Sequence, residues 1–186
     1  MEFKKNLALR VGSEALKGRL IARLVSGYSY WLGGFYTAEL RSGSTREGYT
    51  LKTPGGRSEV LASKTTLSPV RFNKYGIDLS VLDGLAARSL ADARKDGKIV
   101  LLDELGPITL GSGKLAAAVI ETLESGTPCL ATFRRNAEKF EETFRKMDNT
   151  QVLDLDAAGL PDVQARLDGW MEFWIKKLSG GNGGCK

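Results

Sequence analysis

The sequence contains no histidine, little cysteine and no long apolar run. Without histidine, the chain has no imidazole metal ligand, no histidine pH switch and no Ser-His-Asp triad. Its two cysteines, Cys129 and Cys185, lack the C-x-x-C spacing of zinc and thioredoxin-like sites. No stretch approaches the about 18 apolar residues that cross a membrane, and residues 1–5 lack a signal-peptide core. We therefore expect a cytoplasmic protein without a membrane segment, whose acid–base chemistry comes from carboxylates, Lys, Tyr or Cys.

Composition predicts a folded α/β protein of ordinary size. The 186 residues are 42% hydrophobic and 26% charged, which suits one domain, expected over 1–178, followed by a flexible glycine-rich tail over 179–186. The net charge of +5 favours an anionic ligand such as a nucleotide. It falls short of the charge that a nucleic-acid-binding surface usually carries, and the sequence does not identify a protein partner.

The stretch 98–106, Lys-Ile-Val-Leu-Leu-Asp-Glu-Leu-Gly, is the most informative in the chain. Ile99 to Leu102 have the length of a strand buried on both faces of a parallel sheet. Asp103 and Glu104 follow at its carboxyl end, which is where open α/β sheets bind ligands. In phosphate-handling proteins such an Asp holds Mg²⁺ and a following Glu activates water. The alternative is an ordinary strand that ends in two solvated acids.

Hydrophobic periodicity around this stretch predicts alternating strands and helices. Strands are expected over 6–11, 99–102, 128–133 and 151–155, with helices over 14–26, 79–95, 115–123, about 140–147 and 163–178. Residues 31–62 alternate instead, which predicts an antiparallel hairpin or meander after the first helix, and 68–77 is expected to be an ordered loop. The prediction is a mostly parallel sheet, covered on both faces, with an antiparallel hairpin beside it.

The turn between the first strand and the first helix is where a phosphate loop would lie. The pattern G-x-x-x-x-G-K-[ST] falls on residues 11–18, Val-Gly-Ser-Glu-Ala-Leu-Lys-Gly. Only Lys17 matches strictly, because Val11 and Leu16 stand at the glycine positions and Gly18 at the hydroxyl position. A second register takes Gly18-Arg19 as the Gly-Lys pair. Glu14 also brings negative charge into an anion site. By itself the motif is weak, and a lysine in such a pattern is more often a surface lysine.

Several segments in order carry a resemblance to a known family. Residues 34–41 read Gly-Phe-Tyr-Thr-Ala-Glu-Leu-Arg and are followed by Gly43, Arg46, Gly48 and Tyr49; residues 74–79 read Lys-Tyr-Gly-Ile-Asp-Leu, and 102–106 read Leu-Asp-Glu-Leu-Gly. Over roughly residues 6–135 the chain resembles the THEP-type nucleoside triphosphatases, a family of P-loop proteins. The resemblance implies a RecA-like three-layer sandwich that binds a nucleoside triphosphate, ATP or GTP, together with Mg²⁺.

The resemblance also implies roles for individual residues. Gly12, Lys17, Gly18 and Arg19 would hold the nucleotide, with Lys17 on the β/γ-phosphates, and Asp103 would hold Mg²⁺. Glu104 would activate the attacking water, and Arg41 or Arg46 would stabilise charge on the transferring phosphoryl group. Arg41 and Arg46 are equally well interpreted as an ion-pair face with Glu39. Arg134-Arg135 is expected to be a solvated pair, although it lies on the ligand side of the sheet.

Two departures from the family pattern bear on activity. The phosphate loop lacks its glycines and hydroxyl, and Pro107-Ile108-Thr109 replaces the usual Lys-Met-Glu, which removes an acidic residue. The sequence is therefore consistent with two hypotheses. The chain is a nucleoside triphosphatase whose hydrolysis is slow or absent, or it is a non-catalytic relative that binds a phospho-ligand or a protein.

Overall fold

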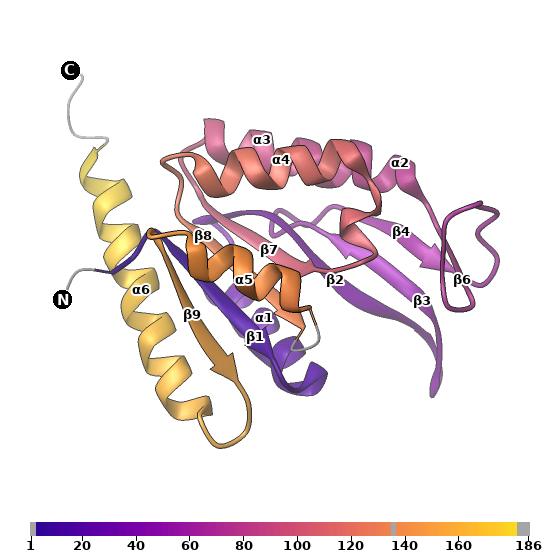
Figure 1. Cartoon of the computed structure of the whole chain (residues 1–186), viewed down its shortest axis with the longest axis horizontal. Helices are drawn as coiled ribbons and strands as arrows, with labels where there is room; N and C mark the ends of the chain where they lie inside the picture. Colours follow the sequence, from indigo (N-terminus) through magenta and orange to yellow (C-terminus); the bar gives the residue numbers. More distant parts are fainter. Residues whose placement is uncertain (1–2, 135–136, 182–186) are drawn as a thin grey trace.

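The computed structural model describes residues 3–134 and 137–181. It shows a single mixed sheet with helices on both faces (Figure 1). The strands are β1 (Asn6–Val11), β2 (Leu32–Ser42), β3 (Thr45–Lys52), β4 (Ser58–Ser63), β5 (Arg71–Phe72), β6 (Tyr75–Ile77), β7 (Ile99–Leu105), β8 (Cys129–Arg134) and β9 (Thr150–Leu155). The helices are α1 (Glu14–Tyr28), α2 (Leu79–Val81), α3 (Ala87–Lys95), α4 (Gly113–Glu124), α5 (Glu138–Lys146) and α6 (Leu160–Gly181). A π-helical turn (Leu82–Ala86) joins α2 to α3, and a short 3₁₀ turn (Thr109–Gly111) precedes α4.

The sheet has a parallel half and an antiparallel half that meet at β2. In the order β5-β6-β4-β3-β2-β7-β8-β1-β9, the strands from β2 to β9 are parallel and those from β2 to β5 are antiparallel. We call the antiparallel half, residues 36–77, the wing. The α/β fold with a hairpin after the first helix is thus confirmed, and the wing also takes in part of the segment expected to be a loop.

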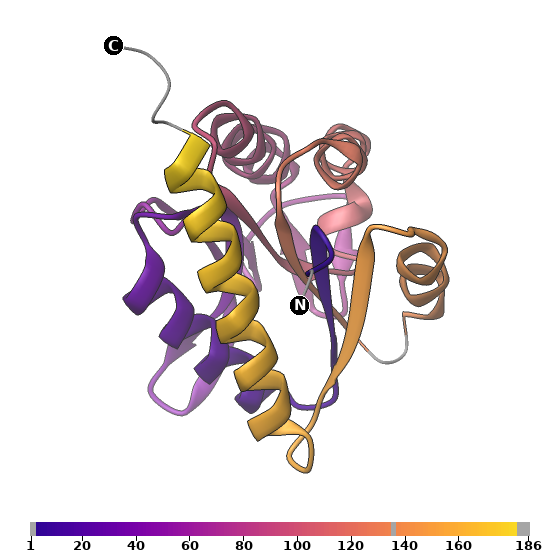
Figure 2. The same cartoon turned by 90° about the vertical axis from the view of Figure 1, so that its left-hand side faces the viewer.

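Two apolar cores separate the layers (Figure 2). On one face, α1 and α6 pack against the parallel strands through side chains such as Leu20, Leu24 and Trp170. On the other face, α3 and α4 cover the sheet and meet it at residues such as Leu90 and Leu115. The four-residue run Ile99 to Leu102 lies between the two layers with 0% exposure, as a strand buried on both faces requires.

A glycine makes the junction between the two halves possible. At Gly34, where β2 pairs with β7, φ is +81°, and a Cβ atom would lie 2.3 Å from the carbonyl oxygen of Leu101. Any other residue would clash with that backbone and would be strained at this φ. Gly34 therefore allows β2 to run along β7 and then leave the parallel half as the base of the wing.

The element ends differ from the expectations in two instructive places. β7 continues through Leu105, so Asp103 and Glu104 lie within the strand and not after it. Helix α6 extends through Gly181, so residues 179–181 are helical and not part of a tail, while 182–186 and Cys185 lie outside the described residues. Within 3–134 and 137–181, no helix combines the length and apolarity needed to span a bilayer.

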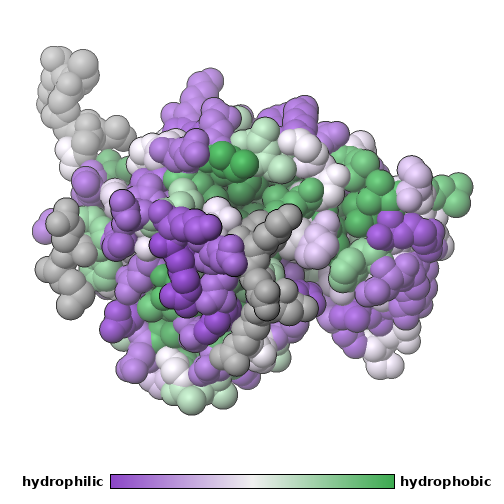
Figure 3. All heavy atoms as spheres, in the orientation of Figure 1, coloured by the Kyte–Doolittle hydropathy of each residue, from purple (hydrophilic) through white to green (hydrophobic). Residues whose placement is uncertain are grey.

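The wing has a different surface from the parallel half. It carries seven Lys and Arg residues against three Asp and Glu, a net +4 of the chain's +5. On the face drawn in Figure 3, hydrophilic side chains gather over the lower part of the wing. The positive charge of the chain is therefore concentrated on the antiparallel half of the sheet.

Candidate active site

The carboxyl ends of three parallel strands bring the expected site residues to one edge of the sheet. β7 and β1 both flank β8, and Val11 at the end of β1 is level with Arg134 at the end of β8. Helix α1 begins three residues after β1 ends. Lys17, Asp103 and Glu104 are therefore neighbours in space, as the sequence predicted for the two elements that carry them.

Lys17 reaches this edge because of where α1 begins. Ser13 caps the helix: its hydroxyl oxygen accepts a hydrogen bond from the backbone N–H of Leu16 at 3.4 Å. Lys17 then lies one turn into the helix, on the side that faces the sheet, and its side chain is only 8% exposed. Its ammonium lies 3.0 Å from Glu104 Oε2, 3.2 Å from Glu14 Oε2 and 3.5 Å from Asp103 Oδ1. Three carboxylates thus surround one buried cation.

Asp103 is held rigidly at the centre of the site. The residue is 0% exposed, and the hydroxyl of Thr132 on β8 donates to its Oδ1 at 2.6 Å. The backbone N–H of Thr37 on β2 donates to Oδ2 at 3.3 Å. Because partners on both neighbouring strands and Lys17 share this carboxylate, its position is fixed by the sheet itself.

The carboxylate of Glu104 is shared by two cations. Arg134 Nε donates to Glu104 Oε1 at 2.7 Å, while Lys17 donates to Oε2. The loop after Glu104 is closed by Thr109, whose hydroxyl donates to the Glu104 carbonyl oxygen at 2.7 Å. Thr109 stands where the family pattern has an acidic residue, so this position serves the loop backbone and adds no charge.

Burial and charge pull the pKa values of these groups in opposite directions. Burial acts to lower the pKa of Lys17, but attraction by Asp103, Glu104 and Glu14 outweighs it and holds that pKa above its ordinary value. Burial likewise acts to raise the pKa of Glu104, yet Lys17 and Arg134 leave it below its usual range. For Asp103 burial prevails and raises the pKa, because Lys17 and Thr132 offset it only in part.

The connection between β1 and α1 has no room for a phosphate loop. Gly12 and Ser13 alone separate the strand from the helix. The N–H of Gly12 donates to the Leu155 carbonyl oxygen at 3.0 Å, and the N–H of Lys17 donates to that of Ser13 at 3.0 Å. With the N–H of Leu16 bound to the cap, three of the six backbone N–H groups of residues 12–17 are already used within the fold.

The other residues expected to bind the nucleotide lie apart from Lys17. Gly18 and Arg19 are exposed residues of α1, directed away from the sheet face that holds Lys17. Leu16, which stands at a glycine position of the phosphate-loop pattern, is 8% exposed and packs in the core between α1, α6 and the sheet. The helical course of residues 14–18 causes both outcomes, because it turns successive side chains by about 100° each.

The hairpin arginines lie on the wing and pair with Glu39. Arg46 Nη1 donates to Glu39 Oε1 at 2.8 Å, and Arg41 donates to Glu39 Oε2. Both arginine side chains are close to half exposed. The structure therefore forms the ion-pair face that the sequence allowed, and no contact joins these two arginines to Lys17 or Glu104 among the interactions of the described residues.

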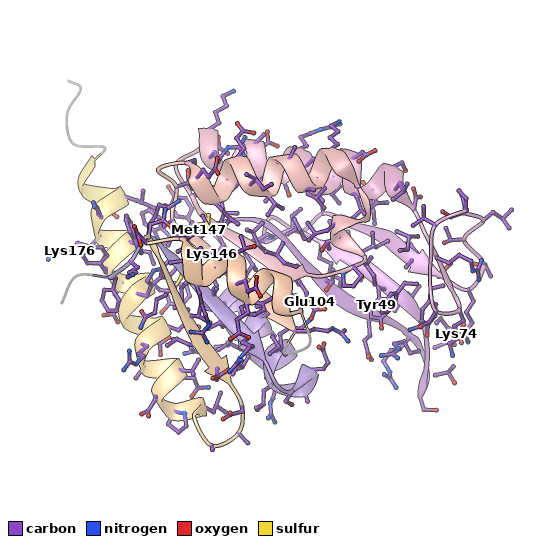
Figure 4. All side chains as sticks on the ribbon, viewed as in Figure 1. Tyr49, Lys74, Glu104, Lys146, Met147 and Lys176 are labelled. Atoms are coloured by element: carbon purple, nitrogen blue, oxygen red, sulfur yellow. The ribbon has the colours of Figure 1, made fainter. Side chains whose placement is uncertain are left out.

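Besides Thr37, which binds Asp103, a second wing residue that lies near the cluster is Tyr49. The Arg46 guanidinium lies over the Tyr49 ring, 5.4 Å from its centroid. Burial raises the pKa of Tyr49 above its ordinary value, and the charges of Arg46 and Arg134 offset this only in part. In Figure 4, Tyr49 lies between Glu104, on the parallel half, and Lys74, on the outer part of the wing. Tyr49 thus links the edge of the cluster to the wing.

Sequence reasoning missed several members of the site. Arg134 was expected to be solvated, but it binds Glu104, while Arg135 lies outside the described residues. Thr37 and Thr132 bind Asp103 through a backbone N–H and a hydroxyl, which no local pattern announces. Only the resemblance of residues 34–41 to the family hairpin offered a signal for Thr37. The remaining partner, Glu14, was visible in the sequence only as a charge of the wrong sign.

The donor set fits Mg²⁺ in kind, although it is sparse. Asp103 and Glu104 supply carboxylate oxygens, and Mg²⁺ commonly takes one or two carboxylates together with substrate phosphates. Gly18 offers no hydroxyl, and within residues 3–134 and 137–181 no group of three or more His, Cys, Asp or Glu side chains is arranged to hold a metal. A metal ion at this edge would therefore depend on phosphate oxygens for its remaining ligands.

Comparison with known proteins identifies relatives of this chain. A family model described as NTPase matches residues 11–159. Nucleoside-triphosphatase THEP1 of Thermotoga maritima is 31% identical over 124 residues, which cover 67% of this chain and 71% of that protein. The protein of the same name from Methanothermobacter thermautotrophicus is 31% identical over 157 residues, 84% of this chain and 87% of its own length.

Solved structures agree on the fold. The crystal structure of THEP1 from Aquifex aeolicus matches with a TM-score of 0.70 at 22% identity, covering 90% of this chain and 96% of the other. The solution structure of a human cancer-related nucleoside triphosphatase matches with a TM-score of 0.68 at 24% identity, over 90% and 98% of the two chains. At these identities the likeness concerns the α/β architecture.

Proposed function

Because the chain belongs to the family of P-loop nucleoside triphosphatases that includes the THEP1 proteins, we propose that it binds nucleoside triphosphates beside Lys17 and hydrolyses them slowly or not at all. One observation carries this proposal. Lys17, Asp103 and Glu104 are assembled at one edge of the sheet, but the lysine is neutralised by three carboxylates and stands behind a two-residue turn.

The assembled residues support a role in phosphate binding. Lys17 is the buried cation at the start of a helix, where an anionic group is favoured by the helix dipole. Asp103 is the carboxylate that would hold Mg²⁺, which when bound neutralises phosphate charge. Glu104 is placed to orient the attacking water; Lys17 and Arg134 keep its pKa low and its carboxylate charged, which makes it a weak base and agrees with slow hydrolysis. These are the roles that the family resemblance assigns to the three positions.

Weak binding and slow turnover follow from what replaces the phosphate loop. The strand pairing, the cap and the helix already use the backbone N–H groups of Gly12, Leu16 and Lys17, so an incoming phosphate meets fewer donors than a phosphate loop presents. It also meets Glu14, Asp103 and Glu104 around the only buried lysine of the cluster, and must displace at least one of them. Both features lower affinity for ATP and GTP, and they reduce stabilisation of the transferring phosphoryl group.

Arg134 is the cation best placed to act on that phosphoryl group. It already contacts Glu104, while Arg41 and Arg46, the residues suggested by the hairpin motif, are bound to Glu39. Replacing each of the three by methionine in turn separates the assignments. The largest fall in turnover is expected for Arg134→Met; a larger fall for Arg46→Met or Arg41→Met assigns the role to the hairpin.

A second candidate function rests on the same ion cluster. Because every charge in it has a partner within the protein, the chain is also suited to be a non-catalytic relative that binds a phospho-ligand or a protein. Calorimetry with ATP and with GTP, each with and without Mg²⁺, separates the two functions. Heat of binding that requires Mg²⁺ supports the nucleotide site, and no heat at millimolar nucleotide leaves the non-catalytic function.

Turnover is tested on the same preparation by release of inorganic phosphate. If any hydrolysis is detected, Glu104→Gln should abolish it without weakening nucleotide binding, since the amide keeps the hydrogen-bonding shape but cannot accept the proton of the attacking water. Turnover that is unchanged in Glu104→Gln contradicts the assignment of Glu104.

A further inference from the structure

The carboxylate of Glu14 lies between two cations at the start of α1. Its Oε2 is 3.2 Å from Lys17 Nζ, and its Oε1 is 3.6 Å from Arg134 Nη2. Glu14 is the first residue of the helix, so the carboxylate also lies in the positive field of the helix dipole. Two cations and a helix start are the features that bind a phosphate group in proteins, and in this chain an acidic side chain of the protein holds that position.

We propose that Glu14 determines the affinity and anion specificity of the site, because its carboxylate holds the position that a phosphate of the ligand would take. The proposal rests on the proposed function, since it concerns the same phosphate site. Every anionic ligand must then exchange with Glu14 on Lys17 and Arg134. A ligand succeeds only if it carries more charge than one carboxylate, which selects phosphate chains over carboxylates and other monoanions.

The exposures of the three acids show which of them exchanges. The Glu14 side chain is 53% exposed, whereas those of Asp103 and Glu104 are 1% and 12% exposed. Glu14 can therefore turn into water from the first turn of α1 without disturbing a core contact. Asp103 remains bound to Thr132 and Thr37, and Glu104 keeps its bond to Arg134. The two acids with proposed roles in metal and water binding thus stay in place while Glu14 leaves.

Removing this internal competitor should strengthen phosphate binding. In Glu14→Gln, Lys17 and Arg134 lose one anionic partner, and an incoming phosphate no longer meets a negative charge within a few ångströms. Because charges at that distance interact appreciably even at a protein surface, we expect about tenfold tighter binding. The gain should be equal for pyrophosphate and for ATP, because Glu14 meets phosphate and not the nucleoside.

The experiment measures binding of pyrophosphate and of ATP with Mg²⁺ by calorimetry to the wild-type chain, Glu14→Gln and Asp162→Asn. Asp162 is a matched control: it is an exposed acid in the first turn of α6, so its replacement removes the same charge from the start of another helix. Far-ultraviolet circular dichroism and thermal unfolding confirm that the variants are folded. The expected result is tighter binding of both probes by Glu14→Gln alone, with Asp162→Asn within about twofold of wild type.

Two results overturn this proposal alone, and a third overturns the proposed function as well. If wild type and Glu14→Gln bind the probes with equal affinity, Glu14 does not compete with phosphate, and the proposed function remains intact. An equal gain in Asp162→Asn shows that net charge is responsible and not the contact. Binding of neither probe by any of the folded proteins at millimolar concentration overturns the proposed function together with this inference.

Discussion

Lys17 and Glu104 are joined by a hydrogen bond of 3.0 Å, although one belongs to the first helix and the other to the central strand. The contact fixes the start of α1 against the carboxyl end of β7. It also means that the cation that would meet a phosphate is, in the resting protein, a partner of the acid that would activate water. The Lys17 side chain therefore contributes both to the stability of the fold and to ligand binding.

Replacing Lys17 by methionine should destabilise the protein. Methionine fills the volume but leaves Asp103 buried without its cation, and breaking a buried ion pair from one side costs roughly 3 kcal/mol. Urea unfolding at pH 7 should show this loss. Lys114→Met, which changes an exposed lysine of α4, is the control and should stay within about 0.5 kcal/mol of wild type. A Lys17→Met protein as stable as the control contradicts the buried pair.

Glu104 should make stability depend on pH in acid. Its pKa in the folded protein lies below the ordinary value of 4.5, so its contribution is present above about pH 4.5 and is lost as the pH falls through the folded pKa. Glu104→Gln should therefore be less stable than wild type at pH 7, by roughly 1.5–3 kcal/mol for hydrogen bonds to a charged group. Urea unfolding from pH 7 to pH 3 should show the two proteins converging, and a constant difference contradicts the shift.

Cys129 should affect stability at alkaline pH instead. Burial raises the pKa of its thiol from 9.0 to about 12. The unfolded chain then releases this proton at lower pH than the folded one, so stability is complete below about pH 9 and falls between pH 9 and 12, by about 1.4 kcal/mol per pH unit at most. Cys129→Ala should lack this part of the slope, measured by unfolding from pH 8 to pH 11. Equal slopes would show that the thiol ionises readily in the folded protein.

Magnesium alone should not bind measurably. Asp103 and Glu104 are the carboxylates of the site; Lys17 contacts both, and no cluster of three potential ligand side chains occurs within residues 3–134 and 137–181. Titration of MgCl₂ into the protein should give no heat at millimolar concentration, whereas Mg²⁺ added with ATP should. Tight binding of Mg²⁺ without nucleotide contradicts a metal held mainly by phosphates.

The sequence predicted the fold well because periodicity reports local structure. The strand 6–11 and the helix that begins at residue 14 lie where the pattern placed them, and the apolar run 99–102 is fully buried. Lys17 lies beside Asp103, as the roles implied by the family resemblance require, because the parallel strands that precede both end at one edge of the sheet. What the sequence did not show is long-range: Thr132 and Thr37 bind Asp103 across strands that are neighbours only in the folded sheet.

The turn between β1 and α1 shows the limit of reading a phosphate-loop motif by alignment. The pattern compares positions, but a phosphate loop depends on where the helix begins, and here Ser13 caps a helix that already begins at Glu14. The shift turns Gly18 and Arg19 to solvent and Leu16 to the core. Glu14 and Arg134, on which the proposed competition with phosphate depends, contact one another between the start of α1 and the end of β8. Neither matches a position that the phosphate-loop motif specifies.

Restoring the missing hydroxyl should therefore not restore metal binding. The motif places a Ser or Thr at position 18, but Gly18 is exposed, and a Cβ atom there would meet nothing within 4 Å. Gly18→Ser should raise the free energy of unfolding by about 0.5 kcal/mol, because serine forms helix more readily than glycine. Gly27→Ser, also in α1 with open space around it, should give a similar gain. The affinity for ATP with Mg²⁺ should be the same in both variants and wild type; a selective gain in Gly18→Ser would mean that α1 unwinds at residues 14–18 to form a phosphate loop when the nucleotide binds.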